Sequence, residues 1–130
     1  MRAIYKLLLL SSLALGSAAP AQEWRYAPEY DVLLTSYDIA PAEIRLKAGE
    51  AVRLRFVNNS NRSHDFSAAS FFSSATLRRR DSETVKGGKV KVGPLQTVTI
   101  ALVPKAGRYK ARSDNFFRRL FGMSGTIVVE

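Results

Sequence analysis

Apolar and polar residues alternate along most of the chain in short runs, which is the pattern of β-strands that bury one face. In the clearest run, Val52, Leu54 and Phe56 would point one way while Arg53 and Arg55 point the other. The other runs of this kind cover residues 32–39, 43–47, 90–92, 98–102, 108–113 and 125–130. Turn residues separate the runs, as in a sandwich whose strands recur about every ten residues. The pattern therefore predicts an all-β sandwich of about seven short strands.

A different period begins after residue 66 and predicts one short helix. Ala68, Phe72 and Ala75 would share one helical face, and Asp65 or Ser67 is placed to cap the helix N-terminus. Two segments show neither period and are expected to be a loosely structured lead-in and a solvated connection: residues 22–31 and 77–86.

The first residues have the composition of a secretory signal. Arg2 and Lys6 precede an apolar stretch at residues 7–15, and small residues follow up to Ala21. The apolar stretch is too short to span a bilayer, and no later stretch is long enough, so we expect no transmembrane segment. We expect removal of residues 1–21, which leaves one exported domain of 109 residues (130 minus 21), periplasmic or secreted.

The charge balance of the expected mature chain is strongly positive. Without the two cations of the signal, 18 Lys and Arg stand against 11 Asp and Glu, a net charge of +7. This balance favours anionic partners or simply a soluble basic surface, and export argues against nucleic acid as the partner. Alternation places seven cations on outward strand faces, where they would bind a partner or block edge-to-edge pairing: Arg53, Arg55, Lys89, Lys91, Arg108, Lys110 and Arg112.

Several motifs of the chain resemble, in their order and spacing, those of the cupredoxins, the plastocyanin- and azurin-type copper proteins. The motifs are residues 41–50, Phe56-Val57-Asn58-Asn59, His64-Asp65-Phe66, Gly107-Arg108-Tyr109 and residues 121–129. The resemblance covers residues 31–130, so residues 22–130 would form one cupredoxin-like domain. It implies a Greek-key β-sandwich with one short helix.

The resemblance also implies where a copper site would lie. Cupredoxins bind copper through an early His and then a Cys, a His and an axial Met near the C-terminus. The first and last of these positions fall on His64 and Met123, whereas the Cys falls on Ser113 and the late His on Arg118. A serine supplies no thiolate, and a guanidinium cannot lose its proton to bind a metal. The chain has no cysteine at all, so the resemblance implies a degenerate type 1 site without electron transfer.

Two interpretations of the remaining ligand positions stay open. His64 and Met123 together suit Cu(I), and Asp65 or Asp114 would add an oxygen for Cu(II). Alternatively, Met123 fills a gap in the core and His64 is a structural histidine satisfied by hydrogen bonds.

Arg118 supports a further hypothesis. Its guanidinium would occupy the vacated metal pocket and pair with Asp65 or Asp114, which would replace the charge of the ion. The alternative is an exposed arginine beside Arg119.

The segment around Arg118 is both aromatic and basic. In the family, the corresponding loop forms an apolar patch through which partners dock. Exposed side chains of this kind mark an interface, whereas buried ones would close the open end of the sandwich as part of the core. The candidate binding residues are Phe116, Phe117, Arg118, Arg119 and Phe121.

These residues lead to two hypotheses of function. In the first, the protein is a monomeric binding module that has no cofactor and docks a protein or another anionic partner through this loop. In the second, it is a periplasmic copper-binding protein or carrier that uses His64 and Met123. An enzyme is not expected: His64 and Ser113 could be neighbours, but Asp65 should point away from the histidine in an extended segment, and no oxyanion-hole motif is visible.

Overall fold

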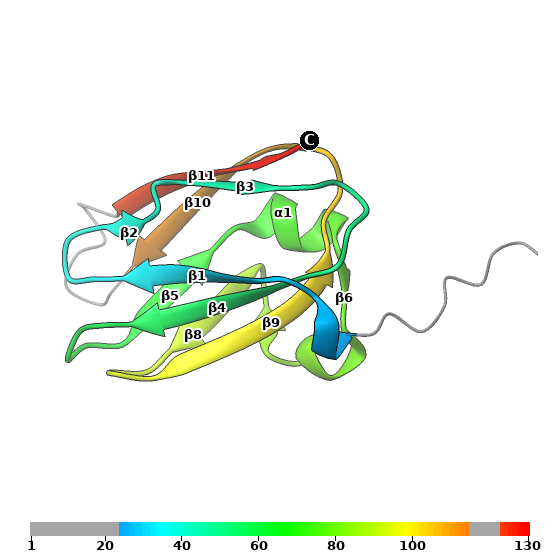
Figure 1. Cartoon of the computed structure of the whole chain (residues 1–130). Coiled ribbons are helices and arrows are strands. Elements are labelled where there is room, and N and C mark those ends of the chain that lie inside the picture. The colour runs from blue at the N-terminus through cyan, green and yellow to red at the C-terminus, as the bar shows by residue number, and fades with distance from the viewer. Residues whose placement is uncertain (1–23, 115–122) are drawn as a thin grey trace, which may run out of the picture.

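The computed structural model of the chain describes residues 24–114 and 123–130, which form two packed β-sheets (Figure 1). The predicted signal segment lies outside these residues. The first sheet has the order β2 (Ile39–Ala40), β1 (Glu29–Leu34), β4 (Val52–Asn58), β9 (Thr97–Val103) and β6 (Thr76–Leu77). The second has the order β3 (Glu43–Leu46), β11 (Met123–Val129), β10 (Gly107–Asp114), β5 (His64–Ser67), β8 (Lys89–Val92) and β7 (Val85–Lys86). The predicted all-β sandwich is confirmed.

Alternation along the strands builds the core between the sheets. In β4, every second side chain is buried, from Val52 through Leu54 and Phe56. Phe56 of the first sheet meets Phe66 of the second with ring centroids 4.6 Å apart. Burial of an aromatic side chain of this size stabilises a fold by about 2–3 kcal/mol, so these rings fasten the two layers together.

The predicted strand at residues 32–39 is two strands in the structure. β1 begins earlier, at Glu29, and pairs in parallel with β4, where Glu29 lies opposite Arg53. After β1 the chain turns, and the Thr35 hydroxyl donates to the Asp38 carboxylate at 2.6 Å. Short pieces such as β2, β6 and β7, each of two residues, raise the number of strands in the described residues to eleven.

The predicted helix forms as α1 (Ala69–Ser74), but its predicted cap is wrong. Ala68 and Phe72 are buried, as the helical face required. Asp65 and Ser67 belong to β5 rather than to the N-cap position, which Ala68 occupies without a side-chain hydrogen bond. Ala68 is tied instead through its backbone, because its N–H donates to the Gly88 carbonyl at 2.9 Å.

Residues 77–86 are more ordered than the solvated connection that we expected. They contain the end of β6, the 3-10 helix η2 (Arg79–Asp81) and β7. Asp81 is buried, and its Oδ2 accepts from Arg78 Nε at 2.7 Å and from the Ala101 N–H at 2.9 Å. These bonds fasten η2 to β9. At the other end of the chain, residues 24–26 form a second 3-10 helix, η1 (Trp24–Tyr26), before β1.

The turn between β7 and β8 requires glycine. Gly88 has a φ of +72°, and a Cβ there would lie 2.5 Å from the Ala69 Cα. The described residues include no helix that is long and apolar enough to cross a bilayer.

Candidate functional site

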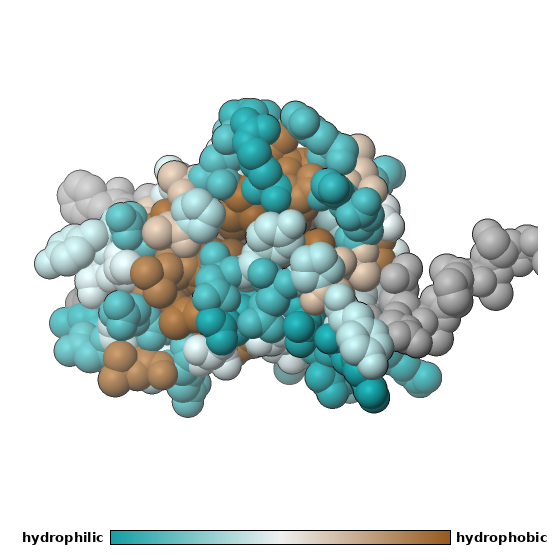
Figure 2. Space-filling model, in the orientation of Figure 1, coloured by the Kyte–Doolittle hydropathy of each residue, from teal (hydrophilic) through white to brown (hydrophobic). Residues whose placement is uncertain are grey.

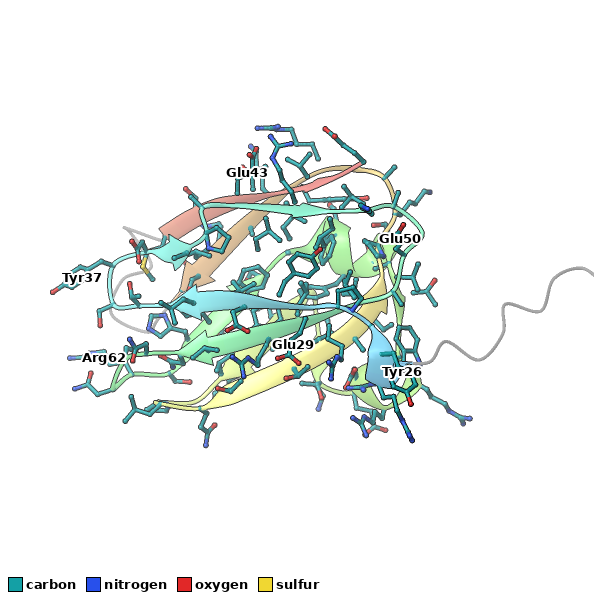
Figure 3. All side chains as sticks on the ribbon, in the orientation of Figure 1. Tyr26, Glu29, Tyr37, Glu43, Glu50 and Arg62 are labelled. Carbon is teal, nitrogen blue, oxygen red and sulfur yellow. The ribbon has the colours of Figure 1, made fainter. Side chains whose placement is uncertain are left out.

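His64 lies at the start of β5 with its side chain fully buried between the sheets. Both ring nitrogens have partners: Nδ1 lies 3.1 Å from Ser113 Oγ on the neighbouring strand β10, and Nε2 lies 2.9 Å from Ser60 Oγ. Ser60 belongs to the turn between β4 and β5 at one end of the sandwich. Arg62, which is labelled in Figure 3, lies in the same turn. The imidazole is therefore enclosed by protein hydrogen bonds.

We assign a direction to this chain of hydrogen bonds from the acceptors around Ser60. Its hydroxyl has two oxygens in reach that can only accept, Asn58 Oδ1 at 2.8 Å and the Arg62 carbonyl at 3.1 Å, so its proton goes to these oxygens. Ser60 Oγ then accepts from His64 Nε2–H, which leaves Nδ1 as the acceptor of the Ser113 hydroxyl. Asn58, Ser60, His64 and Ser113, here the His64 cluster, thus share one consistent set of protons with a neutral imidazole.

Asn58 anchors the cluster, and the sequence analysis did not single it out. The two protons of its Nδ2 are shared among the carbonyls of Arg62, Val92 and Gly93 at 2.7–3.0 Å, and its Oδ1 also accepts the Ser60 N–H. Asparagine is typical of turns, so its residue type alone does not indicate a buried strand position. A signal was present, because Asn58 continues the buried series of β4, and a buried amide must find partners.

Burial controls the protonation of His64. Removal of the ring from water lowers its pKa below the ordinary value, and the negative charge of Asp65 opposes this shift only partly. Asp65 lies on the opposite side of β5 and is half-buried, as expected for the next residue of an extended strand. The ring is therefore neutral at neutral pH, in agreement with the assigned hydrogen bonds.

Met123 lies beside the His64 cluster. It is the first residue of β11 and stands opposite Ser113 in the β10–β11 register, with only 7% of its surface exposed. Since Ser113 also contacts His64, the structure brings together three of the four positions to which the family resemblance assigned ligands. The fourth, Arg118, lies outside the described residues.

These side chains do not fit a type 1 copper ion. Such an ion needs a thiolate and two imidazoles, whereas the described residues offer one imidazole, a thioether and a hydroxyl. Both nitrogens of His64 are already engaged, so a metal would have to displace either Ser113 from Nδ1 or Ser60 from Nε2. Within residues 24–114 and 123–130, no three His, Cys, Asp or Glu side chains come together as a metal-binding group.

The same contact resembles the nucleophile–base pair of a hydrolase, but it is closed to substrates. Ser113 is 1% exposed, so a carbonyl carbon cannot approach its Oγ. The nitrogen of His64 that faces away from Ser113 is held by Ser60 rather than by a carboxylate. This arrangement suits a structural hydrogen bond.

The predicted binding residues Phe116, Phe117, Arg118, Arg119 and Phe121 lie outside the described residues. The two residues that we expected to pair with Arg118 do lie in the described chain. Asp65 and Asp114 stand opposite each other on β5 and β10. Asp114 Oδ1 forms a long ion pair with Arg112 at 3.9 Å and accepts no hydrogen bond within the described chain.

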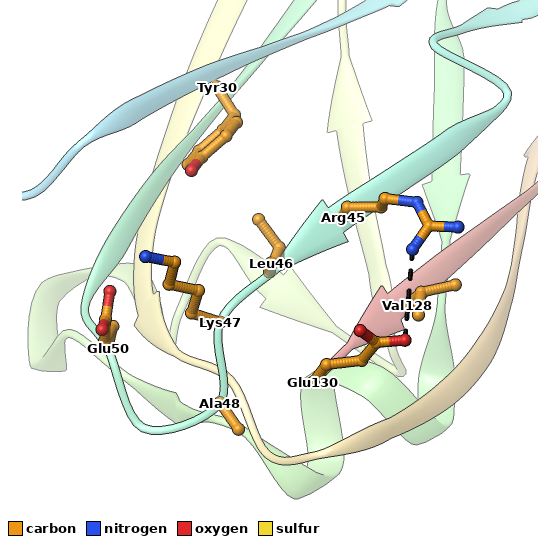
Figure 4. A pocket seen from close by; sticks show the side chains of 8 residues that line it. All are labelled: Tyr30, Arg45, Leu46, Lys47, Ala48, Glu50, Val128 and Glu130. Atoms are coloured by element: carbon orange, nitrogen blue, oxygen red, sulfur yellow. Dashed lines mark ion pairs between the residues drawn. The ribbon is translucent and has the colours of Figure 1, made fainter.

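A separate pocket of about 520 Å³ opens at the edge of the sandwich, where β1 and β3 leave a seam between the sheets (Figure 4). Figure 2 shows apolar residues in this seam with hydrophilic residues around it. Its mixed lining includes Tyr30, Arg45, Glu50 and Glu130, and Arg45 pairs with Glu130 at 4.0 Å. None of the predicted site residues lines it.

A family model described as a cupredoxin-like domain matches residues 6–129. No curated protein matches the chain in sequence.

Among solved structures, auracyanin B has a TM-score of 0.56 at 18% identity, with 80% of this chain and 89% of that chain covered. Auracyanin A, a "blue" copper protein from the green thermophilic photosynthetic bacterium Chloroflexus aurantiacus, has a TM-score of 0.50 at 17% identity, with 78% and 99% covered. A multi-copper oxidase from Pseudomonas thermotolerans has a TM-score of 0.58 at 17% identity, with 80% of this chain and 29% of that chain covered. At these identities the likeness shows the fold alone.

Proposed function

The chain belongs to the cupredoxin-like domain family, and we propose that it is an exported member that binds a partner without type 1 copper chemistry. The observation that carries this proposal is the His64–Ser113 contact of 3.1 Å. At the position where the family places a thiolate, a hydroxyl lies within hydrogen-bond distance of the histidine. The remaining donors suit hydrogen bonding better than they suit a redox-active copper ion.

We assign the binding role to the segment between β10 and β11. Its composition supports this assignment, because aromatic residues and arginine are enriched at protein interfaces. A protein or another partner with an anionic surface would suit Arg118 and Arg119. Export through the signal at residues 1–21 would place this binding in the periplasm or outside the cell.

The first experiment asks whether the protein binds copper. We expect the protein recovered after export to contain no copper, and titrations of Cu(I) and Cu(II) to give the same weak binding for wild type and His64→Ala. The alternative, a periplasmic copper carrier, is favoured by the position of Met123 opposite Ser113. Tight Cu(I) binding that is lost in His64→Ala and in Met123→Ala would establish this alternative and overturn our proposal.

A second experiment rebuilds the missing ligands. The variant Ser113→Cys with Arg118→His should bind Cu(II) and acquire the visible charge-transfer absorption of a copper–thiolate bond. The matched control is Ser124→Cys with Arg118→His, because Ser124 is exposed on the next strand and its side chain points away from the core. Equal absorption in the two variants, or none in the first, would show that the assignment of ligand positions is wrong.

A third experiment tests export and the binding segment. The mass of the exported protein should match a chain that begins at Gln22. A photoreactive residue at position 117 should crosslink to one defined partner, and Arg118→Glu with Arg119→Glu should abolish the crosslink. Intact crosslinking in this variant would argue against the segment as the binding surface.

A further inference from the structure

The outer faces of the two sheets carry charge in different ways. On the first sheet, each arginine has a carboxylate. Arg55 holds Asp31 through two hydrogen bonds of 2.7 Å, and Arg53 lies 3.4 Å from Glu29. The bound guanidinium lowers the pKa of Asp31 below its ordinary value. Two cations and two carboxylates thus neutralise each other on β1 and β4.

The second sheet has an excess of cations on its outer face. On the neighbouring strands β10, β5, β8 and β7, six cations and two carboxylates point outward: Lys86, Lys89, Lys91, Arg108, Lys110 and Arg112, with Asp65 and Asp114. Four lysines of this face have no ion pair in the part of the chain that the structure describes: Lys86, Lys89, Lys91 and Lys110. With Arg112, which reaches Asp114 only at 3.9 Å, these lysines form what we call the basic band.

Strand register aligns part of the band in one row across the sheet. Lys86 stands opposite Lys89, Lys89 opposite Ser67, and Ser67 opposite Arg112. With a strand spacing of about 4.8 Å, the row extends about 14 Å from Lys86 to Arg112. Like charges directly opposite each other destabilise a sheet, so the Lys86–Lys89 pair brings no benefit to the fold itself.

A hydroxyl at the centre of the row also lacks a partner. Ser67 Oγ is shielded from solvent and has no hydrogen-bond acceptor or donor among the described residues. It lies between two long, flexible cations, Arg112 and Lys89. A phosphate group that inserts between these two side chains would offer an oxygen as acceptor to the hydroxyl and a negative charge to each cation.

The chemistry of the face distinguishes between anionic partners. Protein interfaces depend on buried aromatic and apolar anchors. The large apolar side chains exposed in the described chain are Tyr26, Tyr30, Tyr37 and Leu95, and none of them lies on these four strands. A bilayer surface needs no such anchor, because it offers phosphates at many lateral positions to lysines that reach out from a broad face.

We propose that the outer face of the second sheet docks on anionic phospholipid headgroups through the basic band. The row from Lys86 to Arg112 makes the central contacts, and Lys91 and Lys110 flank it. This proposal is independent of copper and of the segment between β10 and β11, so it stands or falls separately from the proposed function.

Vesicle binding tests the proposal. The protein recovered after export is titrated with vesicles of phosphatidylcholine alone and with vesicles that contain phosphatidylglycerol. Wild type should bind only the anionic vesicles, and the binding should weaken strongly between 0.1 and 0.5 M salt, where screening is about twice as short-ranged. Lys86→Gln with Lys89→Gln should weaken it roughly 25-fold, since each cation at an anionic surface contributes about fivefold.

The matched control is Lys47→Gln with Lys105→Gln. It removes the same charge from exposed lysines that lie in turns beyond β3 and between β9 and β10. We expect less than about a threefold loss for this control, and unchanged circular dichroism for both variants.

Equal losses would show that net charge alone drives binding, and binding to neutral vesicles as tight as to anionic ones would exclude headgroup recognition. Tighter binding to polyglutamate than to anionic vesicles would favour an acidic protein instead. Any of these three results overturns the proposal.

Discussion

Polar side chains occupy two contrasting settings in this molecule, the His64 cluster between the sheets and the basic band on the outer face of the second sheet. In the cluster, the side chains of Asn58, Ser60 and His64 all have protein partners at hydrogen-bond distance. In the band, the ammonium groups of Lys86 and Lys89 have none in the described chain.

The difference shows which polar groups remain free to act on a partner. Most buried groups pair within the protein, because an unsatisfied donor or acceptor costs about 1–3 kcal/mol. Once satisfied, such a group specifies the packing and is no longer free to bind a ligand. An exposed cation is satisfied by water and can exchange that water for an anion. His64 and Ser113 are thus engaged with each other inside the fold, whereas the lysines of the basic band are exposed to water.

Removal of the anchor of the cluster should have the largest effect. Asn58→Ala removes the donor of three backbone carbonyls and the acceptor of the Ser60 N–H, while the Ser60 hydroxyl keeps the Arg62 carbonyl, so we expect a loss of about 3–4 kcal/mol in the free energy of unfolding. Urea denaturation measures it. Asn59→Ala is the control, because Asn59 is exposed and should change stability by less than about 0.5 kcal/mol. Similar values for both variants would mean that the cluster contributes little.

The other end of the cluster should contribute less. Ser113→Ala leaves only His64 Nδ1 without a donor, so we expect a loss of about 1–2 kcal/mol, again by urea denaturation. Ser124→Ala on the adjacent strand serves as the control, since Ser124 is exposed. A stabilised Ser113→Ala protein would contradict the assigned hydrogen bond.

Part of this contrast could be predicted from the sequence, because alternation reports the face on which a side chain lies. Along β4, the series Val52, Leu54 and Phe56 defined the buried face, and one step further it reaches Asn58. The turn propensity of asparagine conceals that the strand continues through this residue. The tie between Asp81 and the Ala101 N–H could not be predicted, since the partner lies on a strand twenty residues away.

For the charged surface, the order of the strands limits what can be predicted from the sequence. Alternation correctly placed Lys89, Lys91, Lys110 and Arg112 on outward faces. Their gathering on one side of the second sheet depends on β5 lying between β10 and β8, and no local pattern encodes that order. The neutralisation of Arg53 and Arg55 likewise depends on the parallel pairing of β1 with β4.

The pH dependence of stability should reveal the buried imidazole. Burial lowers the pKa of folded His64, whereas an unfolded histidine titrates near 6.5. Below that pH the unfolded state binds more protons than the folded state. The free energy of unfolding is therefore highest above about pH 6.5 and decreases as the pH is lowered, until the folded pKa is reached. The slope can reach about 1.4 kcal/mol per pH unit. Urea midpoints of wild type and His64→Gln measure it.

The comparison of these two proteins isolates one group, because His64 is the only histidine in the chain. Between pH 5 and 7 the wild-type curve should fall toward acid, and the His64→Gln curve should be flatter. Parallel curves would show that the folded ring takes up a proton as readily as the unfolded one, which would contradict its enclosure by Ser60 and Ser113.

Neutralisation of the basic band should have the smallest effect on the fold. Lys86→Gln with Lys89→Gln removes two exposed charges that face each other, so the free energy of unfolding should change by less than about 0.5 kcal/mol, and an increase is the expected direction. Urea denaturation at low and high salt measures it, and salt should narrow the difference from wild type. A marked loss of stability would mean that the lysines pair within the protein. They would then belong, like the His64 cluster, to the groups that the fold itself satisfies, and they would no longer be free for an anionic surface.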